Sequence, residues 1–198
     1  MGLTTQAYAD RASEYTSLLG SMNAVHHSDR HLVETWADQI EGTILDAGCG
    51  PGHWSAHLAE RGCVMQGIDP VPAFIHHAQT AYPDVEYEIG SIDSLEARTG
   101  SVGGVLAWYS LIHHDPASIQ VPLRELARVL QPNGSLLLGF FVGSAVEPFD
   151  HAVTAAYYWP ITVLTGQLES AGFDVNEAHT RTGPGYRPHG AVIATRKG

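Results

Sequence analysis

The stretch from Thr43 to Ser55, TILDAGCGPGHWS, constrains the fold of this chain more than any other part of the sequence. A short apolar run ends in Asp46, glycines follow at three alternate positions, and the next residues carry apolar side chains at helical spacing. This order predicts a buried strand, a tight turn and a helix. Glycine has no Cβ, so the backbone of the turn can touch a ligand. Such turns lie at the carboxyl ends of strands, where α/β sheets bind nucleoside-containing cofactors.

The spacing of the glycines bears on which cofactor is bound. In the dinucleotide fingerprint G-x-G-x-x-G the last slot is a glycine, whereas here His53 occupies that slot. Asp69 ends the next predicted strand, about 20 positions after the glycines, where an acidic side chain can accept hydrogen bonds from ribose hydroxyls. Two plainer interpretations stay open: Asp69 as the N-cap of the following helix, and the glycine run as an ordinary tight turn.

Further motifs follow in a fixed order over about residues 40–143: LDAGCGPG, GIDP, GSIDSL, AWYSLIHH and LARVLQPNGSLLL. Together they resemble the successive motifs of class I S-adenosylmethionine-dependent methyltransferases, in particular the small, free-standing type that methylates small molecules. The resemblance implies an α/β, doubly wound Rossmann-like fold, with a seven-stranded sheet that is mostly parallel, an antiparallel last strand, and helices on both faces. It also implies one methyltransferase domain over 1–198, with an N-terminal helical cover (1–41), a cofactor-binding core (42–143), and a substrate-side insertion with the C-terminal sheet edge (144–198).

Local patterns predict the elements around this core. Residues 4–19 are expected to form one short helix and residues 29–40 a second. The resemblance implies that these helices lie over the cofactor. Strands are expected at 64–69, 85–89, 103–109, 135–142, 173–179 and 191–195, and helices at 72–81, 117–130 and 161–171. Residues 144–160 are expected to be an aromatic-rich insertion.

The resemblance places the cofactor at the strand ends and the loops that follow them. Ser91 stands where the family often has an aspartate that meets the adenine amino group, so either Ser91 or Asp93 is the expected acceptor, and Ile92 is expected to cover the ring. Tyr15 is either a cofactor or substrate contact or a core aromatic of the covering helix. The expected cofactor-binding residues are Tyr15, Asp46, Gly48, Cys49, Gly50, Gly52, Asp69, Pro70, Ser91, Ile92, Asp93, Ala107, Trp108 and Tyr109.

Two histidines, His113 and His114, come directly after the fourth predicted strand and are the candidate catalytic bases. Histidine has an unperturbed pKa of about 6.5 and can take a proton from an acceptor at neutral pH. The alternative is that one of them packs under the loop and hydrogen-bonds the backbone. No metal site is predicted, because neither the cysteines nor the acidic residues have a convincing ligand spacing.

The methyl acceptor is expected near the strand-four end and the insertion. Tyr157 and Tyr158 offer flat apolar area with polar tips, which suits a small organic ligand. Arg187 is one of few cations at this end and is a candidate partner for an acceptor carboxylate, its alternative being a solvated hairpin residue.

Composition limits the partners. The formal net charge of −11 and the scattered Lys and Arg argue against nucleic acid or an anionic membrane. Two cysteines, no apolar run long enough to span a membrane and no signal pattern lead us to expect a cytoplasmic protein. The small-molecule substrate is what the resemblance implies. The oligomeric state is not predicted. The alternatives to a methyltransferase are a NAD(P)-dependent oxidoreductase, which His53 and the lack of a YxxxK pair disfavour, and a non-catalytic module that binds S-adenosylmethionine.

Overall fold

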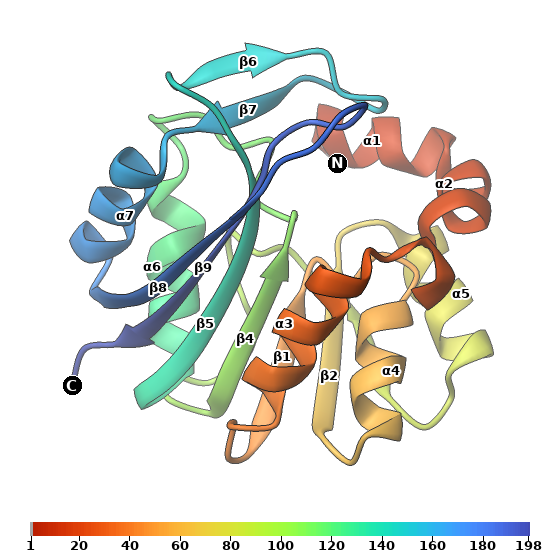
Figure 1. Ribbon diagram of the computed structural model, residues 1–198. Coiled ribbons are helices and arrows are strands. Elements are labelled where there is room, and N and C mark those ends of the chain that lie inside the picture. The colour runs from red at the N-terminus through yellow and green to blue at the C-terminus, as the bar shows by residue number, and fades with distance from the viewer. Residues whose placement is uncertain (1) are drawn as a thin grey trace.

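The computed structural model describes residues 2–198 and shows a sheet with helices on both faces (Figure 1). The helices are α1 (Leu3–Asp10), α2 (Ala12–Leu19), α3 (His27–Ala37), α4 (His53–Glu60), α5 (Pro72–Ala81), α6 (Gln120–Val129) and α7 (Ile161–Ser170), with a 3-10 turn at Met22–Ala24. The strands are β1 (Thr43–Ala47), β2 (Val64–Asp69), β3 (Glu86–Ile89), β4 (Val102–Trp108), β5 (Leu130–Val142), β6 (Glu147–Phe149), β7 (Ala156–Trp159), β8 (Phe173–Arg181) and β9 (His189–Arg196).

The sheet is doubly wound, as expected. Strands β3, β2, β1, β4 and β5 are parallel neighbours in that order, and β9 pairs antiparallel with both β5 and β8. The antiparallel closing strand therefore lies inside the sheet edge. All seven expected strands are present, as β1–β5, β8 and β9. The described residues form two more, because the insertion folds into a hairpin, β6–β7, whose second strand pairs in parallel with the last two residues of β5.

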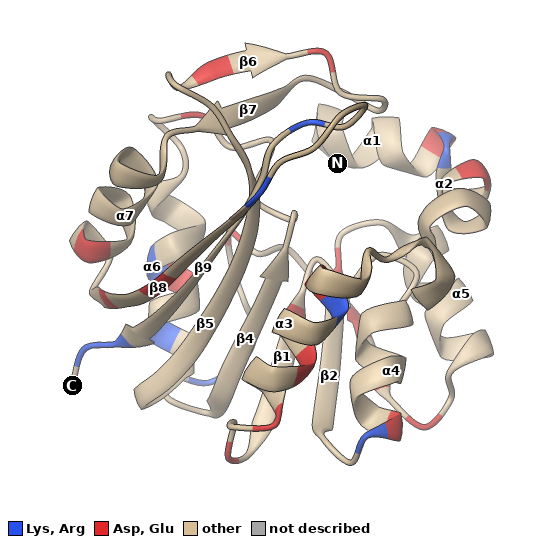
Figure 2. Cartoon of the chain, viewed as in Figure 1, with Lys and Arg blue, Asp and Glu red and all other residues tan. Residues whose placement is uncertain are grey.

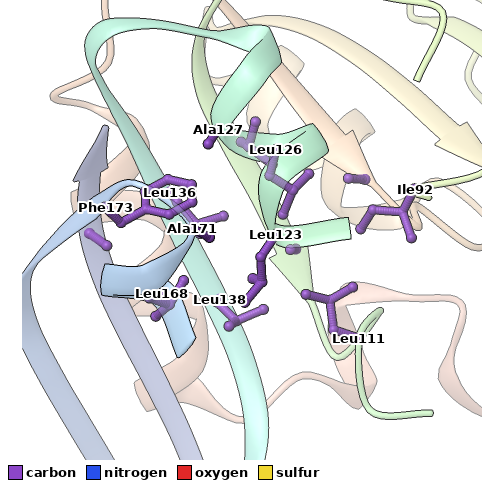
Figure 3. Packing of buried hydrophobic residues seen from close by; sticks show 14 of the residues in the cluster. Ile92, Leu111, Leu123, Leu126, Ala127, Leu136, Leu138, Leu168, Ala171 and Phe173 are labelled. Atoms are coloured by element: carbon purple, nitrogen blue, oxygen red, sulfur yellow. The ribbon is translucent and has the colours of Figure 1, made fainter. Parts of the chain in front are cut away.

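Two buried clusters hold the layers together, one on each face of the sheet. On one face α6 and α7 pack Leu123, Leu126 and Leu168 against β4, β5 and Phe173 (Figure 3). On the other face α3, α4 and α5 pack Trp36, Trp54 and similar side chains against β1 and β2. The apolar positions of α6 recur at helical spacing, which is why this helix was predictable from sequence.

The predicted boundaries of β2 and α5 are confirmed residue for residue. The single helix expected at 4–19 is wrong, because Arg11, with φ −117° and ψ 12°, separates α1 from α2. The break lets α1 turn across the carboxyl ends of the parallel strands, where the β6–β7 hairpin also lies (Figure 1). No helix within residues 2–198 is long and apolar enough to cross a membrane.

Candidate active site

The glycines of the loop after β1 have different roles, although Gly48, Gly50 and Gly52 all have positive φ angles. A Cβ on Gly48 would lie 2.4 Å from the Cβ of Ser110, and one on Gly52 would lie 2.8 Å from a side chain of α5. A Cβ on Gly50 would meet only Tyr15, at 4.0 Å. Packing therefore requires Gly48 and Gly52, whereas at Gly50 the backbone faces open space that a ligand can use.

Asp69, at the end of β2, joins the glycine loop to α5. Its carboxylate accepts from the backbone N–H of Gly50 (3.0 Å) and from that of Val71 (2.9 Å). Val71 is the N-cap residue of α5, so Asp69 does fix the start of that helix without being its N-cap. Burial raises the pKa of Asp69 to about 6, against the lowering effect of these two hydrogen bonds. Each carboxylate oxygen keeps a second lone pair, so the group can still accept from a ribose hydroxyl.

Asp46, at the end of β1, is buried below the loop with 2 % of its surface exposed. Its Oδ2 accepts from the Oγ of Ser55 in α4 at 2.6 Å. Burial raises the pKa of Asp46 to about 7. The side chain therefore anchors α4 beneath the loop. Cys49, also buried, adds no ionised group, because burial raises the pKa of its thiol, and Pro70 is exposed.

Three aromatic side chains, Tyr8, Tyr15 and Phe74, pack together next to Gly50, and we call them the roof. Tyr8 of α1 and Tyr15 of α2 pack edge to face at 5.7 Å, and both contact Phe74 of α5. These rings form a small cluster with Ala12 and Val71, separate from the two main cores. Tyr15 is thus a roof residue next to the open space at Gly50, and the two interpretations of it, packing and ligand contact, are compatible.

The loop after β3 is held to the strand-four loop by a side-chain pair. The Nε2 of His114 donates to Oδ1 of Asp93 at 2.9 Å, and the hydroxyl of Ser91 accepts from the N–H of Asp93. Both Ser91 and Asp93 are exposed, whereas Ile92 is buried in the core on the α6 side. Little of the Ile92 side chain is left to cover an adenine ring, and the adenine contact stays a prediction.

The end of β4 turns sharply. Ala107 is fully buried, and Trp108 packs edge to face on Trp54 of α4 at 6.0 Å. Tyr109 has a φ of 60°, which is unusual for a residue with a Cβ. This turn directs its ring toward β5 and β9, where its hydroxyl is hydrogen-bonded to Nδ1 of His189. Tyr109, expected beside the cofactor, therefore packs against Phe141 of β5 and His189 of β9.

His113 is tied to the chain through both ring nitrogens. Its Nδ1 donates to the carbonyl of Ala155 at 2.8 Å, and its Nε2 lies 2.9 Å from the hydroxyl of Tyr8. The hydrogen bond from Nδ1 to the backbone is the alternative role that the sequence left open for one of the two histidines. The other ring nitrogen, Nε2, still faces the hydroxyl of Tyr8. Burial lowers the pKa of His113, so the ring is neutral at pH 7.

Aromatic rings gather around Phe141 at the end of β5. The ring of Phe141 lies 5.0 Å from that of Tyr109, 5.3 Å from Phe149 and 5.4 Å from His189. His151 bridges this group to His113, its ring 5.5 Å from that of His113. We call Tyr109, Phe141, Phe149, His151 and His189 the aromatic wall.

The two tyrosines expected to bind substrate lie on opposite faces of β7, because successive strand residues alternate. Tyr157 packs against the core on the α7 side, whereas Tyr158 stacks on Phe149 at 4.2 Å. Arg187 lies over the Phe149 ring and donates to the Tyr158 hydroxyl (3.1 Å) and to the carbonyl of Asp150 (3.0 Å). In this structure Arg187 ties the loop before β9 to the hairpin.

A cavity of about 820 Å³ lies on the α3 face, away from Gly50, between α3 and the β8–β9 hairpin. Trp36, Asn133 and Arg181 are among its lining residues, and Tyr109 and His189 border it. Asp29 and Arg181 also line it and form a bidentate ion pair. The cavity thus adjoins the aromatic wall and is separate from the glycine loop.

Sequence reasoning missed Tyr8 and most of the aromatic wall. Tyr8 was recognisable only as a helical apolar position, and His151 and His189 stand in segments without a motif. These residues are brought together by the strand order, which no local pattern encodes.

Comparison with known proteins agrees with this geometry. Residues 44–134 match the family model described as a methyltransferase domain. The chain is 30% identical, over 153 residues, to the ubiquinone biosynthesis O-methyltransferase of Azorhizobium caulinodans, covering 68% of this chain and 59% of the relative. This chain belongs to the class I S-adenosylmethionine-dependent methyltransferase family. It spans about three fifths of the length of that curated methyltransferase.

Solved structures show the same methyltransferase fold. The [4+2]-cyclase SpnF superimposes with a TM-score of 0.82 at 19% identity, over 99% of this chain and 97% of that one. The 1,6-didemethyltoxoflavin-N1-methyltransferase of Burkholderia thailandensis, solved with its substrate and S-adenosylhomocysteine, has a TM-score of 0.74 at 18% identity, over 100% and 92%. At these identities the likeness establishes the fold and leaves the reaction to be argued from the site.

Proposed function

We propose that this chain transfers a methyl group from S-adenosylmethionine to an oxygen or nitrogen nucleophile of a small molecule. The observation that carries the proposal is the open backbone at Gly50, bordered by the Asp69 carboxylate and roofed by Tyr15. The buried hydroxyl of Ser110 adds to the fit, because it adjoins the glycine loop and has no hydrogen-bond partner among residues 2–198. Asp69 would hold the ribose, and Ser110 offers a free donor and acceptor to the rest of the cofactor.

When bound, S-adenosylmethionine supplies a methyl group that its sulfonium has already activated for direct displacement. The chain has to orient the nucleophile and exclude water. In this proposal the rings of Tyr8 and Tyr15 exclude water, and the aromatic wall orients the nucleophile. His113, whose burial keeps its pKa below the usual value and its ring neutral at pH 7, is proposed as the base that ends with the extra proton when the acceptor is deprotonated.

The relatives and the charge distribution support a small-molecule acceptor. The matched curated relative is named for ubiquinone biosynthesis, and one structural neighbour is named for methylating a small heterocycle. Figure 2 shows Lys and Arg distributed over separate elements, which fits a small acceptor better than nucleic acid.

A second candidate function is binding of the cofactor without methyl transfer. The observation that favours it is that both ring nitrogens of His113 already have hydrogen-bond partners, the Tyr8 hydroxyl and the carbonyl of Ala155. Under this alternative Gly50 and Asp69 still bind the cofactor, and no acceptor is methylated.

Calorimetry and a transfer assay test these candidates together. S-adenosylhomocysteine and S-adenosylmethionine should bind to the purified chain, and NADH should not. Radiolabelled methyl transfer should then be measured on a panel of simple phenols, anilines and carboxylic acids. Binding without transfer to any of them favours the second candidate, and binding of NADH alone overturns both.

A further inference from the structure

The Tyr8 hydroxyl and the His113 ring form a hydrogen-bonded pair whose direction is fixed. A carbonyl oxygen only accepts, so the bond from His113 to Ala155 places the ring proton on Nδ1. Nε2 then carries a lone pair, and the hydroxyl of Tyr8 must donate to it across the 2.9 Å that separate them. The oxygen of Tyr8 keeps its own lone pairs, and within residues 2–198 it has no other side-chain partner.

The pair lies between the two halves of the site. On one side Tyr8 packs against Tyr15 and Phe74, the roof above Gly50. On the other side the His113 ring contacts His151 of the aromatic wall. The hydroxyl of Tyr8 covers Nε2 of His113. An acceptor bound on the Tyr15 side of this pair would therefore contact the tyrosine oxygen and not the histidine ring.

Resting on the proposed methyl transfer, we propose that Tyr8 is a catalytic residue that takes the proton of a phenolic hydroxyl acceptor and passes its own proton to His113. The acceptor O–H bond breaks and its proton moves to the oxygen of Tyr8. The original Tyr8 proton moves to Nε2 of His113, which becomes an imidazolium that still donates from Nδ1 to Ala155. The electron pair left on the acceptor oxygen would form the new bond to the methyl carbon as the methyl–sulfur bond breaks and leaves its electron pair on sulfur. Tyr8 is regenerated neutral, and His113 holds the proton until it is released to solvent.

The need for a proton relay narrows the acceptor class. A carboxylate is already ionised at pH 7 and an amine attacks through its neutral form, whereas a phenol has a pKa of about 10 and needs its proton removed. The nearby cations, Arg11 and Arg187, both donate to backbone carbonyls of the insertion, at Ala152 and Asp150. The rings of Phe141 and Phe149 offer flat surfaces for an aromatic acceptor.

The charged and titratable groups around His113 are consistent with a neutral ring that gains a proton only during turnover. Tyr8 faces it from α1 and His151 from the loop after β6, and His114 follows it in sequence. Burial and the neighbouring His114 lower the pKa of His113, while the hydrogen bond to Ala155 raises it.

The first test uses the cofactor-free protein and does not depend on turnover. Long-range ¹H–¹⁵N NMR of the ring nitrogens should show His113 protonated at Nδ1. Tyr8→Phe keeps the ring in place but removes the hydrogen-bond partner of Nε2. The tyrosine oxygen also accepts from Nε2 when His113 is protonated, and that charge-assisted bond is the stronger of the two, so the pKa of His113 should fall in the variant. Tyr82→Phe, at the C-terminal end of α5, is the matched control and should leave that pKa unchanged. A ring protonated at Nε2, or a pKa unaffected by Tyr8→Phe, overturns the relay.

The second test compares two probes, phenol and 2,4-dinitrophenol, the latter ionised at neutral pH. On phenol, Tyr8→Phe should lower kcat by about 10²–10⁴, His113→Ala by a similar factor, and the double variant by little more than either. On 2,4-dinitrophenol, Tyr8→Phe should retain the wild-type kcat within about threefold, because no proton has to move.

The outcomes separate the relay from the methyltransferase proposal. Equal losses on both probes show a structural role for Tyr8 and overturn the relay. Binding of S-adenosylhomocysteine without transfer to either phenol overturns the relay and the phenolic acceptor, while the cofactor site stands. Failure of the wild-type chain to bind S-adenosylhomocysteine overturns the methyltransferase proposal itself, and the relay with it.

Discussion

The proposed cofactor side and the proposed acceptor side of this site are built in different ways. On the cofactor side, Gly50 and Asp69 are 19 residues apart and are joined by a hydrogen bond between neighbouring parallel strand ends. On the acceptor side, Tyr8, His113 and His151 come from three distant segments and meet only after the sheet has formed. In the proposed assignment the cofactor is thus held by a main-chain frame at neighbouring strand ends, and the acceptor by side chains from distant segments.

The largest effect is expected on the acceptor side. His113→Ala should lower kcat on an identified acceptor by about 10²–10⁴ and leave the affinity for S-adenosylhomocysteine nearly unchanged. His114→Ala is the natural comparison, because His114 holds Asp93 on the cofactor side and should affect affinity more than kcat. A larger loss of kcat in His114→Ala than in His113→Ala would reverse the assignment of the two histidines.

Gly48→Ala and Gly50→Ala should separate packing from binding on the cofactor side. A Cβ at residue 48 meets Ser110 at 2.4 Å in a left-handed backbone, so unfolding free energy should fall by about 3 kcal/mol. At residue 50 a Cβ has room, so the free energy of unfolding should fall only by the cost of a left-handed backbone, about 1–2 kcal/mol. The affinity of this variant for S-adenosylhomocysteine should nevertheless fall, because the added Cβ occupies the space proposed for the ligand. Thermal denaturation and calorimetry measure the two quantities. Equal loss of stability in both variants would contradict the distinct roles of these glycines.

Asp69→Ala should weaken S-adenosylhomocysteine binding about 10- to 100-fold, because a hydrogen bond to a charged acceptor contributes about 1.5–3 kcal/mol. Calorimetry at pH 7.5 measures this, with far-UV circular dichroism to show that the variant is folded. Asp93→Ala, on the neighbouring loop, should have a smaller effect. Unchanged affinity in a folded Asp69→Ala would remove the ribose assignment.

The smallest effect is a pH dependence of cofactor affinity. The pKa of Asp69 is about 6, so the carboxylate that accepts from ribose is lost as the pH falls below that value. Affinity for S-adenosylhomocysteine should therefore fall by up to about tenfold between pH 7 and pH 5. Asp69→Asn should bind with no such dependence.

The stability of the unliganded chain should change in the opposite sense. The pKa of Asp69 is higher in the folded chain than its usual value of 3.8, so the folded state binds protons more tightly. Its contribution to stability is full below about pH 4 and is lost as the pH rises through about 6. Denaturant titrations at pH 4.5 and 7 should show a difference that shrinks in Asp69→Asn.

The contrast also explains which parts of the structure were predictable from sequence. The boundaries of β2 and α5 were predicted to the residue, because their apolar periodicity and Pro72 are local signals. The β6–β7 hairpin was not, since Tyr157, Tyr158 and Trp159 form a continuous aromatic run without alternation. Nothing near Tyr8 in the sequence indicates that it meets His113 across 105 positions, because that contact depends on how α1 crosses the strand ends.

The hairpin β6–β7 shares only the tip of β5, where Phe141 and Val142 pair with Tyr158 and Trp159, while β9 holds β5 from Ser135 onward. The register of the central sheet is therefore set without the hairpin. Residues 144–155 precede the buried Ala156 and Trp159 of β7, so changes in this segment should leave the core and the strand pairs of the cofactor loop as they are. The proposed acceptor site can therefore be altered through this segment at little cost in stability.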